Sequence, residues 1–153
     1  MCAIAGILGL PFDSQILDTL LRTMQHRGPD GTGSYMQRQC CLLHSRLAIV
    51  DPEGGAQPMH LCWSGEEYVI TYNGELYNTQ ELRDILQGLG HEFVTHSDTE
   101  VVLHAYAQWG EACVERFNGM WAFAIYDRQE QNLFFSRDRF GVKPLYYWNT
   151  DDA

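Results

Sequence analysis

The sequence predicts an α+β fold in which antiparallel sheets lie between layers of helices. Its elements follow the order strand, helix, strands, helices, strands, which disfavours the strict alternation of a doubly wound parallel sheet. The segment MWAFAIYD (120–127) also presents apolar residues on both faces, as a strand covered on both sides does. The length of 153 residues fits one domain, and 45% hydrophobic residues are enough for a core.

The first half of the chain contains one helix among several strands. Residues 2–9 form an apolar run that predicts a buried strand. Asp13 or Ser14 then caps a helix that ends before HRGPDGTG (26–33), a segment dense in turn-forming residues. The helix has one apolar stripe, made of Ile16, Leu17, Leu20, Leu21 and Met24. We expect short strands at about 33–38, 41–50 and 67–73, with the Gly- and Pro-rich stretch DPEGGAQP (51–58) between the last two.

The second half is predicted to contain two longer helices before the last strands. Asn78 with Glu81 resembles a capping box, and it precedes a helix with Leu82, Ile85, Leu86 and Leu89 on one side. Ser97 with Glu100 repeats the box before VVLHAYAQW, and a short third helix is expected at 111–117. The remaining predicted strands are MWAFAIYD, NLFFSRD (132–138) and KPLYYW (143–148). We expect four aromatic residues to belong to the core: Trp121, Phe123, Tyr146 and Tyr147.

Charge and cysteine usage exclude several classes of protein. The formal net charge is -10 with no block of Lys or Arg, which argues against nucleic acid and anionic membrane surfaces as partners. The first ten residues lack the basic region of a signal peptide, and no apolar run is long enough to span a membrane. An odd number of cysteines without repeated spacing predicts free thiols and a cytoplasmic location. The six scattered histidines and the cysteines show no zinc-site spacing, so we expect no metal.

Four of the cysteines are expected to be small buried residues, but Cys2 has a second interpretation. If Met1 is removed, the Cys2 thiol and the chain's only α-amino group lie on one residue. An α-amine has a pKa of about 7.7–8.0, close to the value of about 8.5 for a thiol, so it can accept the thiol proton near neutral pH. Cys2 is thus either a structural residue or a nucleophile that carries its own base.

Asn73 and Gly74 also have two interpretations. They follow VITY and precede LY, an arrangement typical of a two-residue hairpin turn. Alternatively, the Asn73 amide and the Gly74 N–H are a pair of donors for a developing oxyanion, with glycine allowing close approach to the reacting carbon.

Two charged residues could hold the two ends of an α-amino acid. Arg46 lies in the apolar run CLLHSRLAIV, where a cation needs an anionic partner, either Asp51 or a ligand carboxylate. Asp98 precedes a helix and could cap it, but Ser97 can do so instead and leave Asp98 to bind an ammonium group. Together with the thiol and the paired donors, these residues fit an α-amino acid whose side chain carries a reactive carbonyl.

The motifs of this chain resemble the class II glutamine amidotransferase domain, an N-terminal-nucleophile hydrolase, and specifically the branch found in glutamine-hydrolysing asparagine synthetases. The resemblance covers nearly the whole chain, in the order MCAIAGI, RGPDG, RLAIVD, GAQPM, YNGELYN, SDTEVVL, GMWAFAIYD and RDRFGVKPLYY. It implies a four-layer αββα sandwich of two antiparallel sheets over residues 1–153.

The resemblance also implies a role for each site residue. Cys2 would attack the glutamine side-chain amide to form a γ-glutamyl thioester, and Asn73 with Gly74 would form the oxyanion hole. Arg46 would bind the α-carboxylate, with backbone groups of Leu47 and Ile49 nearby. Glu75 and Asp98 would bind the α-ammonium group. Arg27 and Asn78 would be supporting loop residues around the intermediate.

The expected partners follow from the same family. Glutamine would be the substrate, and a synthetase domain or subunit would receive the ammonia. That second domain uses ATP and magnesium in the family; residues 1–153 contain no SGGxDS-type loop, so we expect these residues to form the glutaminase part alone. The glutaminase part itself is expected to need no cofactor. The alternatives are a glutamine-binding or interaction module without turnover, a fragment of a larger synthetase, and a free-standing hydrolase of another amide.

Overall fold

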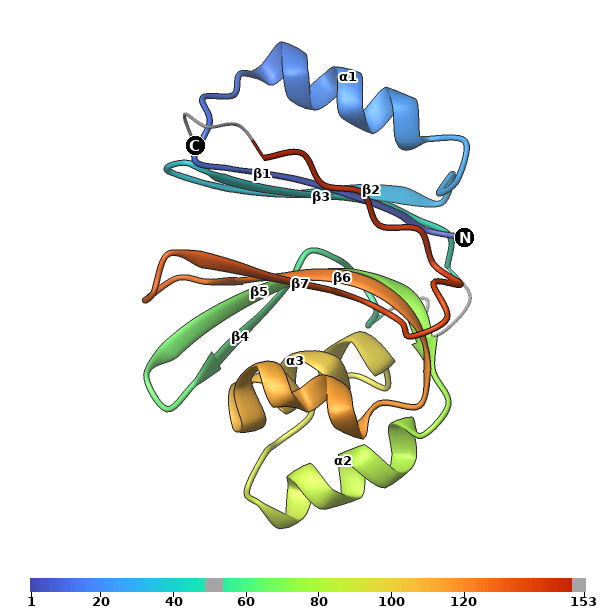
Figure 1. Cartoon of the computed structure of the whole chain (residues 1–153), viewed down its shortest axis with the longest axis vertical. Coiled ribbons are helices and arrows are strands. Elements are labelled where there is room, and N and C mark those ends of the chain that lie inside the picture. Colours follow the sequence, from blue (N-terminus) through green and yellow to red (C-terminus); the bar gives the residue numbers. More distant parts are fainter. Residues whose placement is uncertain (49–53, 150–153) are drawn as a thin grey trace.

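The molecule is built of four stacked layers, as Figure 1 shows. This computed structural model describes residues 1–48 and 54–149. The outer layers are helical, with α1 (Ser14–Met24) on one side and α2 (Thr79–Gly88), α3 (Asp98–Trp109) and the 3-10 helix η1 (Gly110–Arg116) on the other. The two sheets between them have the strand orders β1-β3-β2 and β4-β5-β6-β7, and every pairing is antiparallel. The predicted αββα sandwich is confirmed.

The three-stranded sheet consists of β1 (Ala3–Leu8), β2 (Gly31–Gln37) and β3 (Cys40–Arg46). Successive side chains of a strand point to opposite faces. Accordingly, Cys41 and Leu43 pack with Leu17 of α1, whereas Cys40 and Leu42 pack between the two sheets. The central strand is buried on both faces because it is covered by α1 on one side and by the second sheet on the other.

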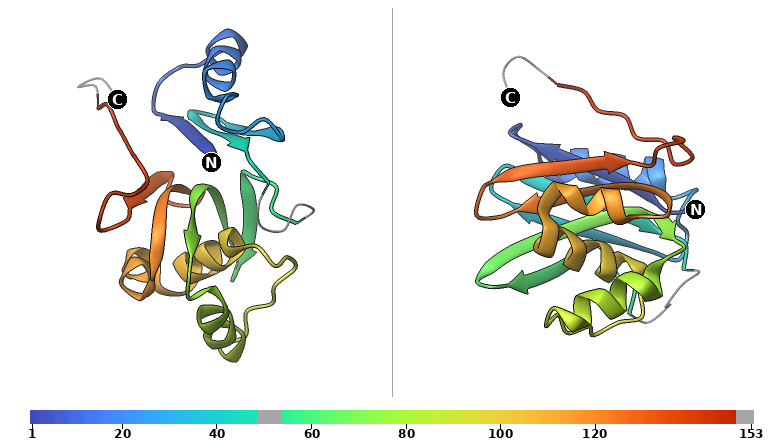
Figure 2. Two further views of the ribbon diagram at one scale, coloured as in Figure 1. Left: turned by 90° about the vertical axis from the view of Figure 1, so that its right-hand side faces the viewer. Right: turned by 60° about the horizontal axis from the view of Figure 1, so that its bottom comes forward.

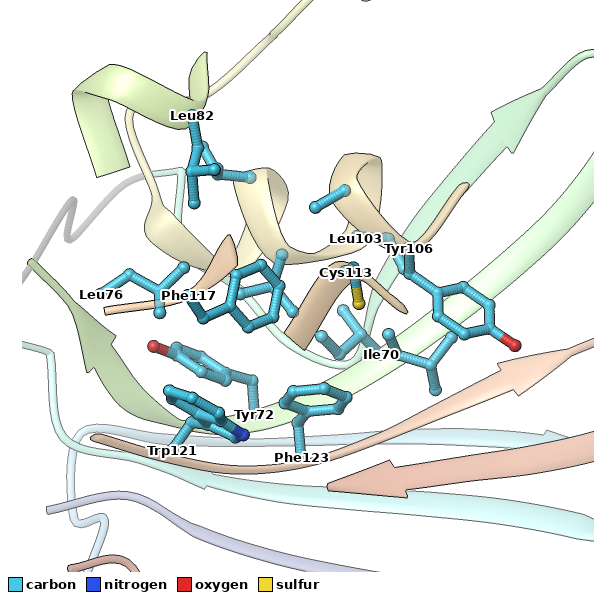
Figure 3. Packing of buried hydrophobic residues seen from close by; sticks show 14 of the residues in the cluster. Ile70, Tyr72, Leu76, Leu82, Leu103, Tyr106, Cys113, Phe117, Trp121 and Phe123 are labelled. Atoms are coloured by element: carbon cyan, nitrogen blue, oxygen red, sulfur yellow. The ribbon is translucent and has the colours of Figure 1, made fainter. Parts of the chain in front are cut away.

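The four-stranded sheet consists of β4 (Met59–Trp63), β5 (Glu66–Leu76), β6 (Gly119–Asp127) and β7 (Asn132–Arg137). Strand β6 confirms the prediction of two apolar faces: Phe123 and Ile125 face the helices, while Ala124 and Tyr126 face the other sheet. Figure 3 shows side chains of this sheet packed against those of α3, η1 and the following segment. The largest core of the protein lies between this sheet and its helices.

Helix capping follows the sequence at two of the three helices. The Asp13 carboxylate accepts a hydrogen bond from Ile16 N at 2.9 Å, and Ser97 Oγ accepts one from Thr99 N at 3.1 Å. Glu100 does not complete the predicted box, because its carboxylate accepts instead from the backbone N–H groups of Val94 and Thr95, each at 2.8 Å. It therefore fixes the loop that leads into α3.

The capping box predicted at Asn78 is wrong. Asn78 occupies the N-cap position of α2, but its side chain makes no capping hydrogen bond. Its amide instead donates to Arg116 O at 3.0 Å and accepts from Asn118 N at 3.0 Å. The tertiary contact with the segment after η1 satisfies both ends of the amide and so replaces the local one.

Two strand predictions also need correction. Strand β4 was not predicted, because its five residues follow directly on the Gly- and Pro-rich stretch. The segment KPLYYW forms no strand, and Tyr146 and Tyr147 are 90% and 76% exposed rather than part of the core. Figures 1 and 2 show this C-terminal segment running past the three-stranded sheet without joining it. An apolar pattern forms a strand only where a partner strand is available.

The cysteines of the structure are all free thiols. Cys40, Cys41 and Cys113 are buried as predicted, but Cys62 lies on the exposed face of β4 and corrects that part of the prediction. No helix in the described part of the chain is both long and apolar enough to cross a membrane.

Candidate active site

A cleft of about 240 Å³ lies where the chain begins, with Met1 and Cys2 among its lining residues. Strand β1 pairs antiparallel with β3, with Ala3 opposite Ser45, so the residue before β1 lies beside the residues that end β3. Pockets that bind drug-sized ligands usually have volumes of about 300–1,000 Å³. The smaller volume of this cleft therefore suits a small metabolite. Among its lining residues are most of those the sequence predicted for the site: Cys2, Arg46, Leu47, Asn73, Gly74, Glu75 and Asp98.

Cys2 is half-buried and lies against the backbone of Leu47. Its sulfur is 3.4 Å from Leu47 N, which donates to it, and 3.6 Å from Leu47 O, to which the thiol donates. These two contacts orient the side chain in the lining of the cleft. The Leu47 backbone predicted to serve a ligand therefore also positions the thiol.

Asn73 and Gly74 lie inside strand β5, opposite Ala122 and Trp121 of β6, so the hairpin-turn interpretation is wrong. A Cβ atom at position 74 would lie 2.6 Å from Met120 O and 2.6 Å from the ring of Tyr72, which no side chain tolerates without a shift of its neighbours. Glycine is thus required here by close packing. The strand delivers an amide side chain and the adjacent backbone to the cleft together.

Arg46 ends strand β3 and is held there by the HRGPDG loop. Asp30 N donates to Arg46 O at 3.0 Å, and the Asp30 carboxylate accepts from Ala48 N at 2.8 Å. Gly28 packs so closely that a Cβ would lie 2.2 Å from the Ser45 carbonyl carbon. The loop therefore fixes the backbone on both sides of the Arg46 side chain.

Asp98 begins α3 and joins this helix to strand β5. Its Oδ2 accepts from Tyr72 Oη at 2.9 Å and from Leu76 N at 3.1 Å. Burial raises the pKa of Asp98 above its ordinary value, although these two hydrogen bonds oppose the shift. Burial, together with the Asp98 charge, raises the pKa of Tyr72 well above its usual value, so that Tyr72 remains a donor.

Two predicted residues lie away from the cleft, and two lie outside the described residues. Arg27 is exposed on the loop after α1, and Asn78 is engaged by the backbone of residues 116 and 118, so neither lines the cleft. Ile49, whose backbone was predicted to serve the ligand, and Asp51, the alternative partner of Arg46, fall in the stretch 49–53 that the structure does not describe.

The structure also adds residues that sequence reasoning did not assign to the site. They are His44, Gln57, Tyr72 and Lys143, and each stands in a motif that the sequence singled out. Gln57 accepts from Tyr72 N at 2.6 Å and donates to Thr99 Oγ1 at 3.1 Å, so it braces β5 against α3.

His44 is a buried histidine in the lining of the cleft. It is 1% exposed, and its Nε2 has no hydrogen-bond partner among the described residues. Burial lowers the pKa of His44 to about 4, so the ring is neutral at pH 7.

A second and larger hollow, of about 500 Å³, is lined by residues of β2, β4, β5 and β6 and of the turns next to them. Its lining includes Arg38, Glu67 and Tyr126, but none of the residues predicted for the site. The smaller cleft therefore remains the candidate active site.

Comparison with known proteins identifies the family of this chain. The family model described as a glutamine amidotransferase domain matches residues 1–153. The chain belongs to this family. It is 46% identical over 151 residues to the glutamine-hydrolysing asparagine synthetase 3 of Bacillus subtilis, and 41% identical over 159 residues to the glutamine-hydrolysing asparagine synthetase 2 of Oryza sativa subsp. japonica.

The amidotransferase domain accounts for only part of these relatives. The matches cover 96% and 100% of this chain, but 25% and 26% of the two synthetases, so the chain spans about a quarter of their length. Among solved structures, the glutamine phosphoribosylpyrophosphate amidotransferase of B. subtilis superimposes with a TM-score of 0.79 over 94% of this chain and 38% of its own. Its sequence identity is 23%, and the likeness shows the fold alone.

Proposed function

We propose that this domain hydrolyses the side-chain amide of glutamine through Cys2, once Met1 has been removed. The observation that supports this most strongly is the position of Cys2 in one small cleft with the donor pair at Asn73 and Gly74 and with opposite charges at Arg46 and Asp98. With Met1 attached, the Cys2 nitrogen is part of an amide and has no useful basicity. Removal of Met1 supplies the base that the thiol needs.

The proposed reaction has two stages. The Cys2 sulfur forms a bond to the amide carbon of glutamine while the thiol proton passes to the α-amine, and the Asn73 amide and the Gly74 N–H stabilise the resulting oxyanion. The α-amine then gives its proton to the leaving nitrogen, the C–N bond breaks, and ammonia departs to leave a γ-glutamyl thioester. Water adds to the thioester, and glutamate and the free thiol are released.

The charges of the cleft account for the proposed selectivity. Arg46 would bind the α-carboxylate, while Glu75 and Asp98 would bind the α-ammonium group. A simple amide would leave these groups desolvated and unpaired, which sites of this kind reject strongly. Glutamine therefore fits better than an amide that lacks the α-amino acid end.

We propose a synthetase domain or subunit as the acceptor of the ammonia, because the relatives are glutamine-hydrolysing asparagine synthetases. The glutaminase reaction itself needs no cofactor. ATP and magnesium would serve only the synthetase part, and the reduced cysteines suit a cytoplasmic enzyme.

The test is a glutaminase assay on purified protein whose intact mass shows that Met1 is gone. Wild type should release glutamate and ammonia in equal amounts, and Cys2→Ala should abolish both while its thermal unfolding remains cooperative. Cys62→Ala is the matched control, since Cys62 is exposed on β4 and lies outside the cleft. Binding of glutamine by wild type without any ammonia release would identify a binding module instead.

A further inference from the structure

The segment after β7 contains a buried lysine at the candidate active site. Within residues 137–149, only Asp138 and Lys143 are buried, each with 5% of its surface exposed. The residues around them are open to solvent; Phe140, for example, is 93% exposed. An exposed loop that buries one long cationic side chain is unusual, because Lys is almost never fully buried without a partner.

The loop is held rigidly in this shape by two side chains. The Asp138 carboxylate accepts from the backbone N–H groups of Phe140, Val142, Lys143 and Trp121, at 3.1, 2.9, 2.9 and 3.3 Å. The Arg137 guanidinium donates to Lys143 O at 2.9 Å and to Gly141 O at 2.7 Å. These bonds fix the backbone of Lys143 from both sides, and so fix where its side chain begins.

The side chain extends from this loop into the cleft. Lys143 lines the cleft together with Cys2, and its Nζ lies 3.2 Å from Met1 Sδ. Met1 is joined to Cys2 by a peptide bond, so this contact places the ammonium group at the residue next to Cys2. A thioether is a weak acceptor and does not neutralise an ammonium group. No carboxylate in the described part of the chain lies within ion-pair distance of Nζ.

We propose that Lys143 is a positioning residue of the reaction, whose charge favours the neutral α-amine and the thiolate of Cys2. This inference rests on the proposed function, since it concerns the nucleophile of that reaction. When Met1 is removed, the sulfur contact is lost, while Lys143 still lines the same cleft as Cys2, whose nitrogen becomes the free amine. A nearby cation disfavours a second positive charge on that amine and stabilises a thiolate, and both effects produce the reactive form of Cys2.

Other charged and titratable groups also face Cys2 in the cleft. They are His44 and Arg46 on β3, Tyr72 and Glu75 on β5, and Asp98 on α3. They are the same in every variant proposed below, and β6 contributes only the uncharged Met120. A change measured on replacing Lys143 therefore reports the charge at that position.

The test is the pH dependence of alkylation of Cys2 by iodoacetamide, measured on the Met1-free protein by peptide-resolved mass spectrometry. Lys143→Met removes the charge and keeps the length, and Lys143→Arg keeps the charge. The midpoint pH for Cys2 should rise in Lys143→Met and remain near the wild-type value in Lys143→Arg, because only the first variant removes the positive charge. Cys62 is an internal control in every sample, because its midpoint should not move.

The same variants are then compared in the glutaminase assay. The acidic limb of the kcat/KM profile should move to higher pH in Lys143→Met and be restored in Lys143→Arg. An unchanged Cys2 midpoint in a folded Lys143→Met protein, or equal shifts in both variants, overturns the inference. If the Cys2 midpoint shifts as expected while wild type releases no ammonia, the proposed function fails, and only the effect of the Lys143 charge on the Cys2 thiol stands.

Discussion

Replacement of Asp98 by asparagine should weaken glutamine binding without unfolding the protein. The carboxylate is proposed to bind the substrate ammonium group, and a hydrogen bond to a charged group contributes about 1.5–3 kcal/mol. Its loss corresponds to a rise of about 10- to 150-fold in the KM for glutamine. The amide oxygen of asparagine can still accept from Tyr72 Oη and Leu76 N, which hold Asp98 at 2.9 and 3.1 Å. The link between α3 and β5 should therefore survive.

The pH dependence adds a second measurement to this prediction. Burial raises the pKa of Asp98, so in wild type the carboxylate gains a proton earlier as pH falls. The KM of wild type should then rise towards acid, and Asp98→Asn should lack this rise. Tyr72→Phe is the matched control, because it removes one hydrogen bond to Asp98 but keeps the charge. Steady-state glutaminase kinetics between pH 5 and 8, with thermal melts of each variant, would check both points. A KM in Asp98→Asn within twofold of wild type would refute the ammonium role.

Three further predictions concern packing and stability. Gly74→Ala should lose about 1–3 kcal/mol of unfolding free energy and most of its kcat, because the new Cβ would lie 2.6 Å from Met120 O. Gly88→Ala is the control: its Cβ would meet nothing within 4 Å, so its stability should be unchanged or increased. Leu86→Ala should lose about 2–5 kcal/mol in urea unfolding, because Leu86 is fully buried, and an unchanged midpoint would contradict this. Burial lowers the pKa of His104 in the folded protein to about 4. As pH falls below about 6.5, the imidazole of His104 is therefore protonated first in the unfolded chain, and the folded state loses stability down to about pH 4. Between pH 7 and 4.5 wild type should thus lose about 2–3 kcal/mol more than His104→Gln, and equal losses would show that His104 takes up its proton equally in both states.

Local patterns of the sequence were sufficient to predict most of the elements. The apolar stripe after Asp13, the Ser97 cap and the doubly apolar strand at 120–127 depend on neighbours a few residues away, and the structure confirms each of them. The layered sandwich followed once the motifs were recognised as a family pattern. Strand β4 was missed, because its five residues depend on pairing with β5.

The composition of the site was also largely available from the sequence. Cys2, Arg46, Asn73 and Asp98 stood out because each residue type is costly or unexpected in its local setting. That they share one cleft was an expectation until the structure was known, because they come from the residue before β1, from β3 and β5 and from the start of α3, and strand register decides which side chains share an edge.

The amino-acid sequence by itself determined the family, the order of elements and the charged and nucleophilic residues of the chain. Only the tertiary structure decided that Asn73 and Gly74 lie within a strand, that Asn78 binds the segment after η1, and that Lys143 reaches the cleft. The physical reason is that hydrogen bonds and burial depend on partners far away in the sequence. A local pattern indicates which kinds of group a residue can bind, and the tertiary structure determines which of those groups lies next to it.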